Sequence, residues 1–194
     1  MANGRVATGF SMPYVALYAA NEGTVTYSNA MPLARGVDVS IEAESSDDNI
    51  FYADNQQAET AAGSFTGGTV TLTVDGLKDD AAKMILGLPA ASEGWTAYGD
   101  EATIPYVGIG FIVRYQEDQV VTWVPVVIAK ATFSMPNLEA ATQEDEIDWQ
   151  TQELEATIMR GDDANHNWKF VGTAQTTEAL ALAALQAKLG VSEG

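Results

Sequence analysis

Histidine and cysteine are the first side chains to consider, because they carry most nucleophilic, acid–base and zinc chemistry. The chain has one histidine, His166, and no cysteine. A Ser–His–Asp triad needs a histidine beside a nucleophile, and a zinc site needs several His or Cys ligands. Because Asp163 and Asn165 precede His166 in a segment typical of a turn, we interpret it as an ordinary turn or strand-edge histidine. We therefore expect no enzyme activity, no cofactor and no metal.

Carboxylates are the other groups that could bind a ligand, and they form two clusters. The first contains Glu42, Glu44, Asp47 and Asp48, and the second contains Glu144, Asp145, Glu146 and Asp148. Ca²⁺ prefers six or more oxygen ligands, but neither cluster has the glycine and terminal glutamate of an EF-hand loop. A glycosidase would need two acids at a set separation in a cleft, which nothing in the sequence indicates. We interpret both clusters as solvated or interfacial acid.

Aromatic and glycine residues offer two further kinds of site. The tryptophans Trp95, Trp123, Trp149 and Trp168 could form a sugar-binding platform. Three of the four lie on expected strands or at their borders, so packing in the core or between subunits is the favoured interpretation. Gly108 and Gly110 lack the third glycine and following helix of a nucleotide loop, and within a strand they indicate a bulge or close packing.

Overall composition excludes some partners. The 194 residues include 27 Asp and Glu against 9 Lys and Arg, a formal charge of −18, which opposes binding to nucleic-acid phosphates and to anionic membranes. A content of 46% hydrophobic residues is enough for one domain with a core. The N-terminal apolar run is interrupted by Pro13 and too short for a membrane span, so we expect a soluble intracellular product.

The stretch 104–133 contains two apolar runs around a polar break at 116–119 and predicts a long β-hairpin. Its second arm is apolar on both alternating faces, and Val124 and Val126 belong to one of them. Such a strand needs cover on both sides, for which we expect the 79–86 helix and a neighbouring subunit. Pro125 removes a ladder donor and therefore predicts an edge or bulge.

The remaining pattern predicts a mainly β fold. Alternating segments indicate strands near 13–19, 24–28, 37–42, 69–74, 153–158 and 166–173, and helices are expected at 79–86 and 177–189. Residues 1–12 are small and polar, which favours a flexible arm, and residues 43–64 are expected to be a long loop. The whole chain, 1–194, is predicted to be one antiparallel β-sandwich or barrel-like domain with a short flanking helix and a C-terminal helix.

The order and spacing of several segments resemble a known family. They are PYVALYA after the N-terminal arm, FYADNQ at 51–56, TVTLTVDGLKDDAAKMILG at 69–87, GIGFIVRYQ at 108–116, ATFSMPNLEAATQEDEIDWQTQELEATI at 131–158, and the C-terminal Ala/Leu helix. Together they resemble the major tail protein, the tail tube subunit, of long-tailed bacteriophages with non-contractile tails.

The resemblance implies a β-sandwich subunit that forms hexameric rings, which stack into a tube for DNA ejection. It places the protein in the virion tail, assembled in the host cytoplasm, with a tape measure protein inside the tube and terminator and distal tail proteins at its ends. DNA would pass an acidic lumen without specific binding. By position in the family, Phe51, Tyr52, Asp54 and Asn55 are expected to make ring-to-ring contacts.

Two alternatives stay open from the sequence. A monomeric β-sandwich that binds carbohydrate could use the tryptophans and acidic loops. The tube protein of a contractile secretion system is a second structural alternative. Beside the loop residues, Val124 and Val126 are candidate inter-subunit contacts, because they lie on the extra apolar face of the 104–133 hairpin.

Overall fold

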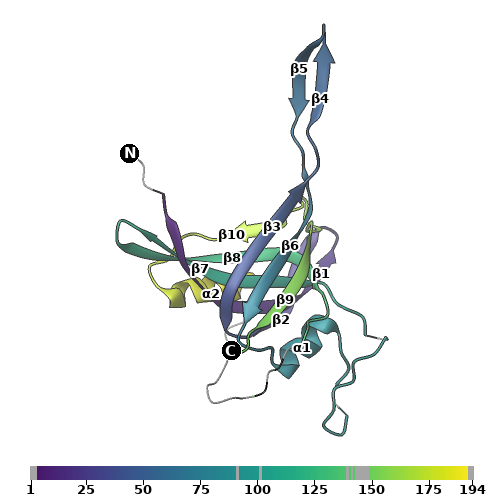
Figure 1. Cartoon of the computed structure of the whole chain (residues 1–194), viewed down its shortest axis with the longest axis vertical. Helices are drawn as coiled ribbons and strands as arrows, with labels where there is room; N and C mark the ends of the chain where they lie inside the picture. The colour runs from purple at the N-terminus through teal and green to yellow at the C-terminus, as the bar shows by residue number, and fades with distance from the viewer. Residues whose placement is uncertain are drawn as a thin grey trace.

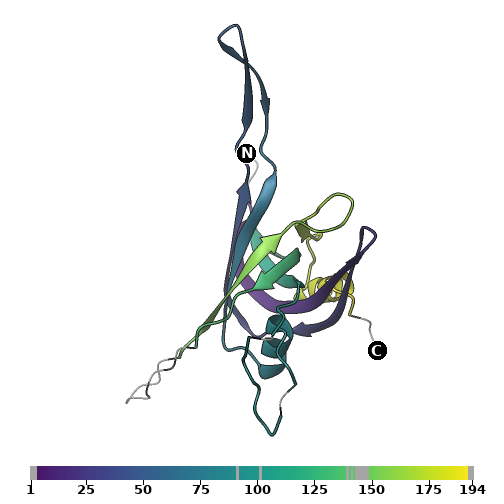
Figure 2. The same cartoon turned by 90° about the vertical axis from the view of Figure 1, so that its right-hand side faces the viewer.

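The computed structural model of the chain describes residues 4–90, 92–100, 102–138, 140, 142 and 149–191. It is a mainly β domain, as the sequence predicts, and the β4–β5 hairpin projects from its body (Figures 1 and 2). The elements are β1 (Val6–Asn21), β2 (Thr24–Pro32), β3 (Gly36–Ser45), β4 (Asn49–Ala53), β5 (Gln56–Ala61), β6 (Phe65–Val74), α1 (Asp79–Leu86), β7 (Val107–Glu117), β8 (Val120–Phe133), β9 (Gln152–Met159), β10 (Lys169–Val171) and α2 (Glu178–Lys188).

One curled antiparallel sheet of eight strands forms the body. Its hydrogen-bonded order is β2-β1-β7-β8-β9-β6-β3, and β10 pairs with β8 beside this path. The curl brings β3 close to β1, where the Phe10 ring lies so near Gly36 that an added Cβ would be 2.1 Å from a ring carbon. Because β1 and β3 are not hydrogen-bonded neighbours, the barrel-like sheet stays open along this line.

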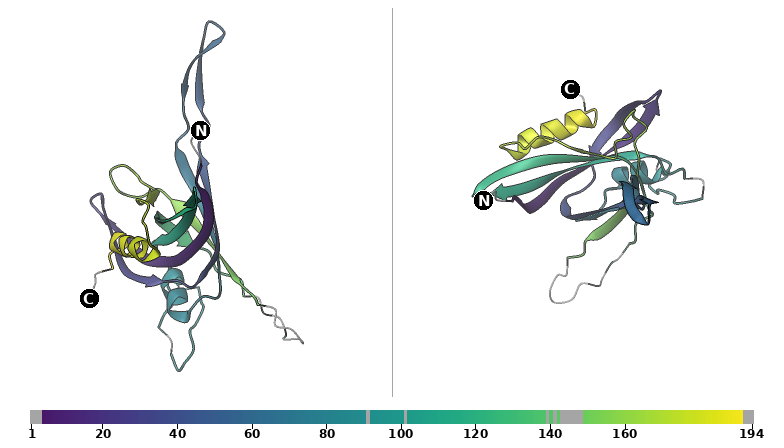
Figure 3. Two further views of the ribbon diagram at one scale, coloured as in Figure 1. Left: turned by 90° about the vertical axis from the view of Figure 1, so that its left-hand side faces the viewer. Right: turned by 90° about the horizontal axis from the view of Figure 1, so that it is seen from above.

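The sheet carries one apolar cluster on each face. The inner cluster joins β1, β6, β7, β8 and β9 to α1, and its fully buried large side chains are Leu33, Leu72, Ile85, Leu86, Ile109, Phe111, Ile128, Leu154 and Ile158. In the outer cluster, Ile112 and Val127 of the sheet pack under Leu185 of α2, which lies over β7 and β8 (Figure 3). The expectation that the 79–86 helix covers one face of the 104–133 hairpin is confirmed, because Ile85 and Leu86 of this helix share the inner cluster with Val126. The expectation of a neighbouring subunit is wrong for the other face, which the C-terminal helix covers.

The β8 strand changes face partway along its length. Val126 and Ile128 face the inner cluster, and so do Ala131 and Phe133, although Ala131 is three positions after Ile128, an odd step. The pairing register with β7 shifts at the same place, which identifies a β-bulge. A strict period of two would put Ala131 on the opposite face, so alternation in the sequence could not reveal the bulge.

Gly108 and Gly110 of β7 let neighbouring elements approach the sheet closely. A Cβ added to Gly108 would lie 2.4 Å from the ring of Tyr27, and one added to Gly110 would lie 2.7 Å from a methyl group of Leu185. These distances confirm the interpretation of the two glycines as close-packing positions.

Pro125 does not open the β7–β8 ladder, in which it pairs with Ile112. Its carbonyl accepts a hydrogen bond of 2.8 Å from the amide of Gly172, so its ring nitrogen also points away from β7. The next contact along that side joins Trp123 to Gln175. The missing N–H donor of Pro125 therefore faces the β10 side of β8, just beyond the last residue that pairs with β10. The predicted opening of the ladder occurs on that side of β8 and not on the β7 side.

Both helices begin and end close to the predicted residues. Gly87 follows α1 with φ of 62°, the left-handed conformation that ends many helices. The hydroxyl of Thr177 accepts a hydrogen bond of 3.3 Å from the amide of Leu180 at the start of α2. The side chain of Gln186 donates to the Tyr14 hydroxyl at 3.1 Å, which ties α2 to β1.

The N-terminal segment differs from its expected form. Residues 1–12 were expected to be flexible, but β1 begins at Val6, which pairs with Gln116 at the far end of β7. Small polar residues predict little order by themselves, and here the long edge of β7 supplies their hydrogen-bond partners. Gly4 and Arg5 lie before the sheet, and residues 1–3 lie outside the described part of the chain.

Candidate assembly surfaces

The segment 43–64 is a projecting hairpin rather than the expected loop. It begins with the end of β3 and continues as β4 and β5, which pair antiparallel (Figure 2). Asp54 and Asn55 form its turn with φ of 50° and 60°. Positive φ at both central residues defines a type I′ turn, in which Asp and Asn are favoured. The strands contain Asn, Gln and Glu, which have low strand propensity, so the sequence pattern did not predict them.

The base of the hairpin is bonded as an extension of β3 and β6. The amide of Ser46 donates to the Ser64 carbonyl at 2.9 Å, and the amide of Gly63 donates to an Asp48 carboxylate oxygen at 2.8 Å. No side chain fits at Gly63, because a Cβ there would be 1.7 Å from the carbonyl oxygen of Ser46. The hairpin therefore continues the direction of the two body strands (Figure 1).

Apolar side chains on the hairpin have no cover from the body. Every residue of β4 and β5 is exposed, including Phe51 at 62% and Tyr52 at 61%. An isolated two-stranded hairpin is marginally stable in water, and exposed aromatic clusters commonly mark interaction sites. The structure brings the four predicted contacts Phe51, Tyr52, Asp54 and Asn55 together on this hairpin.

The other two predicted contacts are largely buried. Val124 and Val126 are 1% and 6% exposed and belong to the inner cluster. The prediction that they form an exposed face for a neighbouring subunit is therefore wrong, and Val126 reaches only the floor of a groove between β3 and β1. Both faces of β8 are apolar because the sheet has a core on one side and α2 on the other, and the sequence could not tell this helix from a partner.

Strands β3, β6 and β9 lie side by side (Figure 1), and their exposed side chains form an acidic surface that we call the acidic face. Side chains that pair across the three strands form rows on this face. One row contains Asp38, Thr73 and Glu153, and the next contains Ser40, Thr71 and Glu155. Glu42, Thr69 and Thr157 continue the same pattern. None of the three strands contains Lys or Arg. The face therefore combines hydroxyl groups with uncompensated negative charge.

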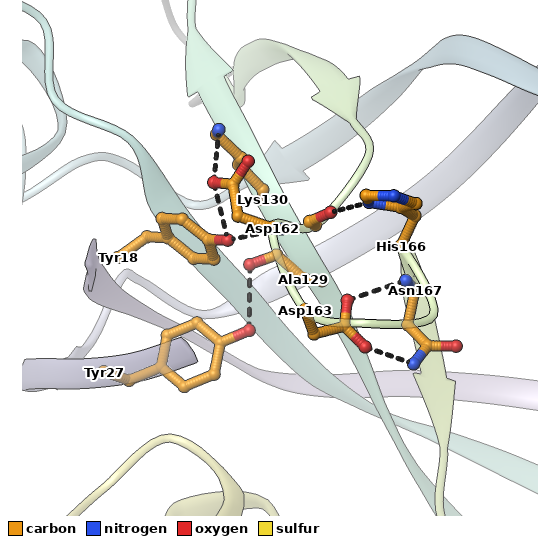
Figure 4. A network of polar contacts seen from close by, with 9 residues as sticks. Tyr18, Tyr27, Ala129, Lys130, Asp162, Asp163, His166 and Asn167 are labelled. Carbon is orange, nitrogen blue, oxygen red and sulfur yellow. Dashed lines mark hydrogen bonds and ion pairs between the residues drawn. The ribbon is translucent and has the colours of Figure 1, made fainter. Parts of the chain in front are cut away.

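A polar network ties the β9–β10 connection to β1 and β8 (Figure 4). The Lys130 ammonium lies 2.8 Å from a carboxylate oxygen of Asp162, and the Tyr18 hydroxyl donates to the same oxygen at 3.0 Å. Asp163 accepts a hydrogen bond of 2.8 Å from the amide of Asn167. His166 lies in this turn, as predicted, with Nδ1 3.1 Å from the Gly161 carbonyl oxygen.

The electrostatics of this network are those of a structural clamp. The hydrogen bonds from Lys130 and Tyr18 lower the pKa of Asp162 below its ordinary value, so its carboxylate is ionised at neutral pH. Burial raises the pKa of Tyr18 and, more strongly, that of Tyr27. The Tyr27 hydroxyl donates to the Ala129 carbonyl at 2.9 Å, beside the bulge of β8. These shifts keep Asp162 ionised and Tyr18 and Tyr27 neutral at neutral pH, as their hydrogen bonds in the clamp require.

The carboxylates do not form a recognisable metal site in the described ranges. No three His, Cys, Asp or Glu side chains come together there in a way that could hold an ion. Of the first predicted cluster, Glu42 and Glu44 lie on β3, and Asp48 bonds at the base of the hairpin. The residues Glu144, Asp145, Glu146 and Asp148 lie outside the described part of the chain.

The tryptophans divide into two groups that the sequence did not separate. Trp168 stacks on Phe65 with ring centroids 4.6 Å apart. Trp95 and Trp149 are 82% and 83% exposed. The prediction that they pack in the core is therefore wrong for Trp95 and Trp149. A contact between subunits stays a prediction for these two residues. Leu138, 90% exposed, lies in the same β8–β9 connection as Trp149 and was missed because a lone leucine in a loop carries no pattern.

Comparison with models of known protein families gives no match, and comparison with curated proteins gives none either. In the part of the chain that the structure describes, no helix is long and apolar enough to cross a membrane.

Proposed function

We propose that this chain is a structural subunit that assembles with copies of itself into stacked rings. The rings would form the tail tube of a bacteriophage with a long, non-contractile tail, the conduit for DNA ejection. The observation that carries the proposal is the β4–β5 hairpin, which projects from the body with Phe51 and Tyr52 exposed. A subunit that stays alone in solution gains nothing from such an arm, whereas an assembling subunit can bury it.

The acidic face supports the same role. A tube that carries DNA must not bind it, and a surface of carboxylates without cations repels phosphates. Strands β3, β6 and β9 provide such a surface, with Glu42, Glu153 and Glu155 pointing outward. We assign this face to the lumen. A tape measure protein inside the tube, terminator and distal tail proteins at its ends, and a place in the virion tail are further parts of the proposal.

Concentrated purified protein, alone or expressed with its tail partners, tests the proposal by light scattering and negative-stain microscopy. We expect rings or hollow tubes. Strictly monomeric protein under all of these conditions would contradict it.

A carbohydrate-binding module is the second candidate, since Trp95 and Trp149 are exposed as sugar-stacking groups would be. Glycan-array binding that is lost in Trp95→Ala and Trp149→Ala variants, without any assembly, would favour this function. The tube protein of a contractile secretion system shares the proposed architecture, and the presence or absence of sheath genes beside this one separates the two.

A further inference from the structure

An apolar groove runs along the line where the barrel-like sheet stays open. It has a volume of 490 Å³ and lies between β3 on one side and β1, β7 and the end of β10 on the other. Val39 and Ile41 of β3 face Phe10 of β1 and Val113 of β7 across it. The groove exists because β3 pairs only with β6 and leaves its other edge unpaired beside β1. An unpaired edge above an apolar floor favours the docking of another extended segment.

The rim of the groove is apolar and positively charged. Val37 and Val171 are 55% and 54% exposed at its lips. Arg5 and Lys169, two of the nine cations in a chain with a charge of −18, also line it, and Asp38 is the one acid among the described lining residues. Among the described residues, neither cation forms an ion pair; Arg5 lies over the Tyr115 ring and Lys169 over the Trp168 ring.

We propose that this groove receives the β4–β5 hairpin of a second copy of the chain. The hairpin has the complementary chemistry: Phe51 pairs across the strands with Glu59, so an aromatic ring and a carboxylate share one face. Asp54 adds a second acid at the tip. The ring would pack on the apolar floor while the acids face Arg5 and Lys169.

The positions of hairpin and groove suit a head-to-tail arrangement. The groove lies beside Val37, Val39 and Ile41 near the beginning of β3, and the hairpin extends from the other end of the same strand (Figure 1). At about 3.3 Å per residue, the nine residues from 46 to 54 reach roughly 30 Å beyond the body. A second copy displaced along the direction of β3 would place its groove at the hairpin of the first copy.

This contact joins different surfaces of the two copies, so it repeats without closing and extends a stack. It rests on the proposed function, because only stacked copies place the hairpin at the groove. One such contact is small compared with a stable dimer interface, but a ring of subunits repeats it, which multiplies its effect.

Engineered disulfides test the inference, since the chain contains no cysteine of its own. A Tyr52→Cys and Val37→Cys double variant, assembled and then oxidised, should give a ladder of covalent multimers on a non-reducing gel. The control pairs Tyr52→Cys with Val120→Cys, which is 62% exposed outside the groove, and should give no ladder. Tubes that form without the Val37 ladder, or with equal ladders in both variants, would overturn the docking proposal and leave the tube proposal standing.

A mixing experiment separates docking from folding. A variant with Phe51→Ser and Tyr52→Ser keeps its groove, and a Val37→Glu variant keeps its hairpin. Each alone should need at least a tenfold higher concentration to form stacks, whereas their mixture should form short assemblies that contain both variants and do not extend. A mixture that behaves like the separate variants would overturn the proposal. If wild-type protein forms no assembly at all, the proposed function fails and this inference fails with it.

Discussion

Replacing Phe51 and Tyr52 with serine should impair tube extension while leaving the subunit folded. In the isolated subunit both side chains are mostly exposed, at 62% and 61%, and neither belongs to the inner or outer apolar cluster. Surface substitutions of this kind change the free energy of unfolding by less than about 0.5 kcal/mol. The urea midpoint of the double variant should therefore equal that of wild type.

The loss for assembly is much larger. With about 200 Å² per aromatic side chain, the exposed fraction leaves roughly 120 Å² for each residue to bury on docking. At about 25 cal/mol per Å² this is an upper value near 3 kcal/mol per residue and subunit. Even one third of the combined value, about 2 kcal/mol, raises the concentration needed for stacking roughly 30-fold.

The assay is light scattering over a concentration series, with negative-stain microscopy of the same samples. Val120→Ser is the matched control, because Val120 is also 62% exposed but lies at the start of β8, and this variant should assemble as wild type does. Two results would contradict this prediction. Tubes from the double variant at wild-type concentration would show that the hairpin does not dock, and a strongly lowered urea midpoint would show that its aromatics pack within the subunit.

Three further predictions follow from the body of the subunit. Leu185→Ala should lower the free energy of unfolding by about 2–5 kcal/mol, since the side chain is fully buried between α2 and the sheet. A loss below about 1 kcal/mol in urea denaturation would mean that the packing of α2 on the sheet contributes little to stability. Asp162→Asn should cost less than about 1 kcal/mol at pH 7, because the pair with Lys130 is partly exposed. The folded-state pKa of Asp162 is lowered, so the stability that its carboxylate contributes is fully present above the usual aspartate pKa of about 3.9 and is lost as pH falls through the lower folded pKa. The difference in free energy of unfolding between variant and wild type should follow the same course. An equal difference at pH 7 and pH 2 would speak against the clamp. Lysine at Glu153 and Glu155 should give tubes that retain DNA at low salt and release it at high salt, and variant tubes that ignore DNA would remove the acidic face from the lumen.

Much of the fold could be predicted because local patterns and tertiary environment agree. Clean alternation located β3, β6 and β9, and the Asp residues and Gly87 located α1. The two apolar faces of β8 correctly indicated cover on both sides. What covers the outer face could not be predicted, because alternation states that a face is buried and carries no information on whether a helix or another chain buries it.

The candidate site was predicted in part for similar reasons. Phe51 and Tyr52 stood out as aromatics in a polar segment, but the hairpin strands were missed because their exposed Gln and Asn side chains have low strand propensity. The groove could not be found at all. It joins Arg5, Val37 and Lys169 from three distant segments, and only the incomplete closure of the sheet between β1 and β3 brings them together.

The most direct test of the central claim is negative-stain microscopy of the purified wild-type protein at high concentration. We expect stacked rings that form hollow tubes, with the acidic strands β3, β6 and β9 around the lumen. A uniform population of monomers at every concentration and salt condition, with tail partners present or absent, would contradict it.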